Sequence, residues 1–145
     1  MPATAGKIVA GVDGSEPSVA ALRWAVRQAE LTGGSVHAVI AWQFPLTTSG
    51  FSWVPTPAFD DVDYADLAAK ALGTVVEQVS TTATISQQVL EGDAAGVLLD
   101  AAADAELLVV GNRGHGAFAD ALLGSVSERC TRHAQCPVVV VHAPK

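Results

Sequence analysis

The sequence predicts an α/β fold in which parallel strands alternate with helices that cover both faces of one sheet. Short apolar runs rich in Val and Ile alternate along the chain with longer segments of helical periodicity. The runs are nearly continuous, as in strands that are buried on both faces. Half of the 145 residues are hydrophobic and 16% are charged. We therefore expect one compact domain over residues 1–145.

The first elements follow the chain from its amino end. Residues 7–13, KIVAGVD, form an apolar run that ends in Gly and Asp, so we expect a buried strand that enters a turn. Ser15 then supplies a helix N-cap and Pro17 suits a first helical turn, and a Gly-Gly pair ends this helix. Residues 35–42, SVHAVIAW, predict the second strand. Residues 43–59 follow neither period and predict an unusually long loop.

The second half of the chain continues the alternation. The predicted elements are a helix over residues 60–79, a strand near 84–90, a helix over about 93–103, the strand ELLVVG ending at Gly111, a helix over 125–134, and a last strand, CPVVVVH, with Pro137 as its first residue. Five strands and four helices result. Because strand–helix–strand crossovers are right-handed, the helices are expected on both faces of the sheet.

Composition excludes some functions. The formal net charge is -7, and the eight Lys and Arg residues form no basic stripe, so nucleic-acid binding is not expected. The amino end lacks a signal-peptide pattern and the chain lacks a long apolar run, which predicts a soluble cytoplasmic protein without membrane attachment. Cys130 and Cys136 match no zinc spacing and are expected to be reduced thiols. Trp24, Trp42 and Trp53 are expected to pack in the core.

One segment carries candidate chemistry. VVGNRGHGAFADALLGSVSER follows the fourth strand and has the pattern G-x2-G-x9-G-S. Its glycines are Gly111, Gly114, Gly116 and Gly124. Glycines let backbone N–H groups approach an anion closely, and the following helix N-terminus attracts negative charge. The hydroxyls of Ser125 and Ser127 can donate to the same phosphates, so the segment predicts polyphosphate binding.

A purely structural interpretation is also open. The glycines could only turn the chain, and Ser125 with Glu128 could form an S-x-x-E capping box without any ligand. The pattern is neither a Walker loop nor the G-x-G-x-x-G fingerprint, so the mechanisms of those families are not carried over.

Three motifs together resemble the universal stress protein family, over essentially the whole chain. They are GVDGS after the first strand, the G-x2-G-x9-G-S segment after the fourth, and the closing CPVVVV. The glycine segment is similar to that of the ATP-binding branch of the family. The resemblance implies a Rossmann-like sheet of the adenine nucleotide alpha hydrolase type, with strand order 3-2-1-4-5. Ligands of such sheets bind where neighbouring strands send their helices to opposite faces.

The resemblance also implies a set of binding residues. On the adenosine side they are Gly11, Val12, Asp13, Ile40 and Ala41. Around the ribose and phosphates they are Gly111, Asn112, Arg113, Gly114, His115, Gly116, Ala117, Gly124, Ser125, Val126 and Ser127. Asp13 would lie near the ribose or near magnesium bound to ATP, or it is only a turn residue. Arg113 is the only fixed cation of the loop between Gly111 and Ser125. His115 could approach a phosphate or simply be solvated.

The function expected from these features is an ATP-binding regulatory module of the stress response. The alternative is a slow ATPase or phosphotransferase at the same site, and a flavin or nicotinamide protein is a third class that the fold alone leaves open. Lys7, Lys70 and Lys145 all lie away from the glycine segment, which favours binding over turnover. The resemblance implies a homodimer, and the exposed apolar edge over residues 137–141 is the expected contact. A different protein partner is an alternative that the sequence leaves open.

Overall fold

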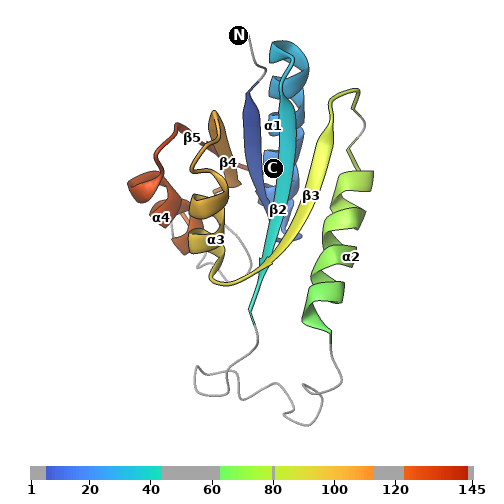
Figure 1. Ribbon diagram of the computed structural model, residues 1–145, viewed down its shortest axis with the longest axis vertical. Helices are drawn as coiled ribbons and strands as arrows, with labels where there is room; N and C mark the ends of the chain where they lie inside the picture. The colour runs from blue at the N-terminus through green and yellow to red at the C-terminus, as the bar shows by residue number, and fades with distance from the viewer. Residues whose placement is uncertain (1–5, 44–62, 80, 113–122, 144–145) are drawn as a thin grey trace.

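Figure 1 shows the computed structural model, in which one five-stranded sheet has helices on both faces. The structure describes residues 6–43, 63–79, 81–112 and 123–143. Within them the elements are β1 (Lys7–Val12), α1 (Glu16–Thr32), β2 (Ser35–Trp42), α2 (Tyr64–Glu77), β3 (Ile85–Glu91), α3 (Ala94–Ala101), β4 (Leu107–Gly111), α4 (Ser125–His133) and β5 (Val138–Val141). All strand pairs are parallel, in the order β3-β2-β1-β4-β5. The predicted fold class and strand order are confirmed.

Some elements begin later than predicted, among them two helices whose starts are set by a capping side chain. Asp63 accepts a hydrogen bond from the Asp66 N–H at 3.0 Å, so α2 begins at Tyr64; residues 60–62 of the predicted helix lie outside the described residues. Asp93 likewise caps α3 and stands outside that helix. Strand β5 begins one residue later than predicted, and the carbonyl of Pro137 accepts from the Leu108 N–H at 3.0 Å.

The alternation of side chains along the strands divides the core in two. On β1, Ile8, Ala10 and Val12 pack toward the face that α1 and α2 cover, whereas Val9 packs toward the face of α3 and α4. All four side chains are at most 4% exposed. Because both faces of the central strands are covered, their sequences read as continuous apolar runs rather than alternating ones.

The expected core role of Trp24 is wrong. Its side chain lies on the outer side of α1 and is 36% exposed, because the buried stripe of this helix is formed by its neighbours Leu22, Ala25 and Val26. Trp42 does pack against the core on the α2 side, and its ring stacks on that of Tyr64 with centroids 6.4 Å apart. The third tryptophan, Trp53, lies outside the described residues.

Two glycines let helices approach the sheet closely at its carboxyl edge. A Cβ added to Gly111 would lie 2.7 Å from the carbonyl carbon of Pro17, so the first turn of α1 rests directly on the end of β4. A Cβ added to Gly11 would lie 2.7 Å from Cδ1 of Leu98 in α3, on the opposite face. In the part of the chain that the structure describes, no helix is long and apolar enough to cross a membrane.

We predict that Gly111→Ala destabilises the fold by about 1–3 kcal/mol, because the new methyl group meets backbone atoms that cannot move aside. Gly73→Ala is the matched control: the added Cβ meets nothing within 4 Å in the middle of α2, so stability should rise by up to about 1 kcal/mol. Urea unfolding of both variants measures the difference, and equal midpoints would contradict the close contact at Gly111.

Candidate functional site

The carboxyl ends of β1 and β4 lie side by side although they are far apart in the sequence. The two strands pair directly, with Ile8 opposite Leu107 and Ala10 opposite Val109. Helix α1, which follows β1, packs on one face, and α4, which follows β4, packs on the other. The side to which the chain leaves the sheet thus reverses between β1 and β4, and open α/β sheets bind their ligands at such a switch point.

Asp13 closes the turn that follows β1. Its Oδ1 accepts hydrogen bonds from the backbone N–H of Ser15, at 2.9 Å, and from the Ser15 hydroxyl. Its own N–H donates to Ser18 Oγ at 3.2 Å, and the intervening Gly14 has a φ of 85° that favours glycine. Asp13 is therefore a turn residue, and its side chain is nevertheless exposed at the carboxyl edge of the sheet.

A buried hydrogen-bond junction joins β4, β5 and α4. The Asn112 N–H donates to the Val141 carbonyl at 2.8 Å, which continues the β4–β5 pairing by one residue. The Asn112 carbonyl accepts from the Gly124 N–H at 2.7 Å and from Ser127 Oγ at 3.0 Å. Ser127 Oγ also lies 3.0 Å from the Gly124 carbonyl. The two ends of the glycine-rich segment are therefore held next to each other.

Among the described residues, no side chain caps the N-terminus of α4. Its N-cap is Gly124, which has no side chain to make the cap hydrogen bond. Ser125 is the first helical residue rather than the N-cap, and Glu128 pairs with Arg132 at 3.4 Å, so the alternative of an S-x-x-E capping box is wrong. Helix N-termini of this kind carry unpaired N–H groups and partial positive charge, which suit an anion.

Packing holds α4 in place from its buried side. Cys130 is fully buried and Val126 packs against the same cluster. Arg129 forms an ion pair with Asp93, the N-cap of α3, at 2.8 Å. These contacts fix the direction in which the helix N-terminus points.

The adenosine-side candidates come together through the β1–β2 register. Gly11 and Val12 are buried, and Val12 lies opposite Ile40, which is 6% exposed. Ala41 follows and is half-buried. Around the junction, Gly111, Asn112 and Gly124 to Ser127 are described and adjacent. Of the predicted phosphate-side residues, Arg113, Gly114, His115, Gly116 and Ala117 lie outside the described residues.

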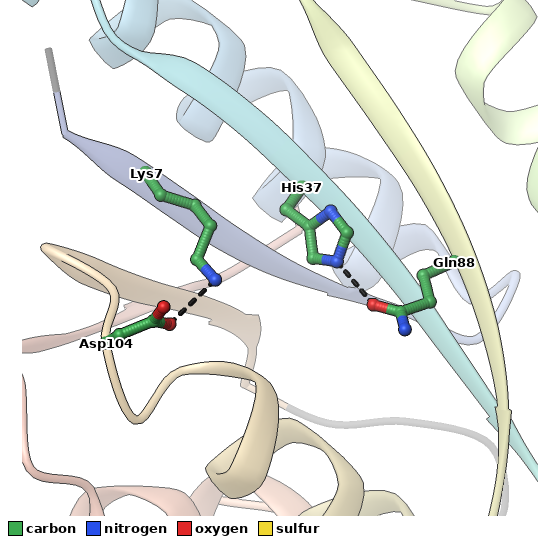
Figure 2. A network of polar contacts seen from close by, with 4 residues as sticks. All are labelled: Lys7, His37, Gln88 and Asp104. Carbon is green, nitrogen blue, oxygen red and sulfur yellow. Dashed lines mark hydrogen bonds and ion pairs between the residues drawn. The ribbon is translucent and has the colours of Figure 1, made fainter.

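Two polar contacts involve residues outside this set, one at the amino end of β1 and one between β2 and β3. Lys7 Nζ and Asp104 Oδ1 pair at 2.7 Å, and His37 hydrogen-bonds Gln88 (Figure 2). The hydrogen bond and charge of Lys7 lower the pKa of the Asp104 carboxyl. Lys7 begins β1 and is thus placed as the sequence predicted, at the opposite end from Asp13.

The sequence model of one family, described as the universal stress protein family, matches residues 4–142. The chain belongs to the universal stress protein family. Universal stress protein Rv2623 of Mycobacterium tuberculosis is 37% identical over 146 residues, which cover 93% of this chain and 47% of that protein. The chain thus spans about half the length of the curated universal stress proteins that it matches.

Solved universal stress proteins share the fold. UspA from Lactobacillus plantarum superposes with a TM-score of 0.75 at 22% identity, over 96% of this chain and 99% of the other. A universal stress protein in complex with cAMP gives 0.62 at 25% identity, over 97% and 100%. The Archaeoglobus fulgidus protein in complex with dAMP gives 0.58 at 20% identity, over 95% and 98%.

Sequence reasoning missed two roles at this site. It assigned Gly111 to the ligand, whereas the structure gives this glycine a packing reason in its contact with Pro17. It assigned the hydroxyl of Ser127 to phosphates, whereas that hydroxyl is 3.0 Å from two backbone carbonyls and the residue is 2% exposed. The i, i+3 spacing of Ser127 and Cys130 is the one signal in the sequence that places Ser127 on the buried side of α4.

We predict that Cys130 makes the fold sensitive to alkaline pH. Burial raises the pKa of its thiol from 9.0 to about 11, so the folded state keeps a proton that the unfolded state loses. The stability that the folded state gains from the protonated Cys130 thiol is fully present below pH 9 and is lost as the pH rises to about 11. Cys130→Ala should lower the free energy of unfolding at neutral pH. In this variant the fall in that free energy between pH 9 and pH 11 should be smaller than in the wild type, by on the order of 2 kcal/mol.

Cys136→Ala is the control for this pH dependence, because burial also raises the pKa of Cys136 and that residue is only half-buried. The urea midpoint is measured from pH 7 to pH 11, and its slope against pH should differ from the wild-type slope less in Cys136→Ala than in Cys130→Ala. An unchanged slope in Cys130→Ala would show that its thiol is not the group responsible.

Proposed function

We propose that this chain is an ATP-binding universal stress protein that acts in the cytoplasm as a nucleotide-dependent regulatory module of the stress response, with residues 1–145 as a single domain. The observation that carries the proposal is the N-terminus of α4, whose N-cap is Gly124 and which no side chain caps in the described part of the chain. It is held beside Asn112, where the helices after β1 and β4 leave to opposite faces. The complex of a universal stress protein with cAMP, at 25% identity, supports an adenine nucleotide as the ligand.

The proposed site divides into two halves. The phosphates would meet the backbone N–H groups that begin α4, with the exposed Ser125 hydroxyl as an added donor, and the sequence offers the glycines and Arg113 of the neighbouring segment. The adenosine would lie over the ends of β1 and β2, near Asp13 and Ala41. Apart from Arg113, both halves use backbone groups or short side chains, which suits a ligand that approaches the chain closely.

Magnesium would arrive with the nucleotide. No cluster of three or more His, Cys, Asp or Glu side chains suitable for a metal occurs within the described ranges. A single exposed carboxylate, that of Asp13, fits an ion that keeps several waters and takes its other ligands from phosphates. The ion would offset phosphate charge, while Asp13 would orient it relative to the sheet.

Regulation would follow from the junction described above. A phosphate bound at α4 stabilises the arrangement in which α4, β4 and β5 meet at Asn112, because the anion interacts with that arrangement more strongly than with any other. Occupancy would thereby change the stability of the β5 edge, the surface that we propose for assembly.

Calorimetric titration of nucleotide-stripped protein with ATP and magnesium tests the proposal. We expect saturable binding at one site per chain, and absence of binding heat at high ATP concentration would overturn it. Asp13→Ala should weaken the affinity about tenfold, because it removes a charged ligand-side group. Asp104→Ala, an exposed carboxylate near the amino end of β4, should leave the affinity unchanged.

We further propose that the chain forms a homodimer through residues 137–141. Strand β5 is at the edge of the sheet, and all four of its valines are only partly buried. An apolar edge strand with unpaired backbone groups favours pairing with a second copy.

Val139→Lys or Val140→Lys should convert the dimer into monomers or aggregates, because each places a charge on the proposed contact strand. Leu67→Lys is a suitable control, since Leu67 is 54% exposed on α2, away from β5. Light scattering gives the mass, and an unchanged dimer in both edge variants would count against this interface.

A further inference from the structure

The hydroxyl of Ser127 links the two ends of the glycine-rich segment. It lies 3.0 Å from the Asn112 carbonyl, at the end of β4, and 3.0 Å from the Gly124 carbonyl, at the start of α4. Ser127 is 2% exposed and belongs to the buried stripe of α4. A hydroxyl has one proton to donate, and here both neighbouring acceptors belong to the protein.

Ser125 occupies a different environment two residues earlier. It is the first residue of α4, it is exposed, and it makes no cap hydrogen bond. The two serines of GSVS therefore have different surroundings: the Ser125 side chain is exposed at the start of α4, and the Ser127 side chain lies in the protein interior.

We infer that Ser127 is a positioning residue of the nucleotide site, acting on the backbone of Asn112 and Gly124 and not on the ligand. This inference rests on the proposed function. By holding the helix N-terminus at a fixed distance from the end of β4, Ser127 makes the phosphate-binding N–H groups converge before a ligand arrives. Such preorganisation raises affinity because less ordering is needed on binding.

The fold should survive loss of this hydroxyl. The Asn112 carbonyl keeps the Gly124 N–H as a donor at 2.7 Å, and the Gly124 carbonyl keeps the Glu128 N–H at 2.9 Å. Removing Ser127 Oγ thus leaves neither acceptor without a partner. A buried neutral hydrogen bond contributes about 1 kcal/mol, which corresponds to about fivefold in an equilibrium constant.

The test compares three alanine variants of the full chain. Ser127→Ala removes the junction bond, and Ser125→Ala removes only the exposed hydroxyl. Thr131→Ala is the matched control, because Thr131 donates to the Glu128 carbonyl at 2.8 Å on the same helix but away from the junction. The measurements are the amide hydrogen exchange of Gly124 in the ligand-free protein, by NMR, and the affinities for ATP and for adenosine.

For Ser127→Ala we expect about fivefold faster exchange at Gly124 and about fivefold weaker ATP binding, with adenosine affinity unchanged. Ser125→Ala should weaken ATP without changing that exchange rate, which is the signature of a direct donor. Thr131→Ala should change neither quantity.

Unchanged exchange at Gly124 in Ser127→Ala would overturn the inference, and so would faster exchange with undiminished ATP affinity. If the wild-type chain binds no nucleotide, the proposed function fails, and the positioning role in nucleotide binding fails with it. The exchange rates are measured without ligand, so they still decide in that case whether Ser127 holds the junction.

Discussion

The pairing of β1 with β4 is the contact on which the rest of the molecule depends. It brings together two strands whose following helices leave toward opposite faces, and it can form only if both helices start close to the same edge of the sheet. Gly111 lets the first turn of α1 rest on the end of β4, because a Cβ there would meet Pro17. Gly11 lets α3 pack closely on the other face, because a Cβ there would meet Leu98. We place the nucleotide at the carboxyl edge where β1 and β4 end.

The candidate site is built largely from backbone groups. The N-cap of α4 is a glycine, Asn112 contributes its N–H and carbonyl to the junction, and Asp13 uses its carboxylate to close a turn. Backbone groups cannot move independently of the elements that carry them, so their positions depend on packing at some distance. Cys130 in the core and the ion pair of Arg129 with Asp93 provide that packing for α4.

The same junction connects the site to the edge of the sheet. Asn112 donates to Val141, the last residue of β5, and it accepts from the first residues of the α4 region. A ligand at α4 and a second copy at β5 would therefore act on one set of hydrogen bonds. The proposed nucleotide response and the proposed assembly share a physical connection through this residue.

The sequence by itself determined the alternation of strands and helices, the edge at which β1 and β4 end, and the family to which the chain belongs. Apolar runs, Ser15 as an N-cap and Gly33 as a C-cap are local signals, and the structure has them where the pattern placed them. The strand order followed from the resemblance rather than from periodicity, because period alone does not say which strands are neighbours.

Only the tertiary structure decided the role of each residue at the site. Ser125 and Ser127 carry the same hydroxyl, and their different roles arise because one lies on the exposed side and the other on the buried side of α4. Trp24 likewise reads as a core residue, but α1 turns it outward. Gly111 serves packing against Pro17, a contact that depends on folding the chain back on itself. The i, i+3 spacing of Ser127 and Cys130 indicates the buried side of α4. The contacts of Ser127 with Asn112 and of Gly111 with Pro17 join segments far apart in the sequence, and no local pattern encodes those.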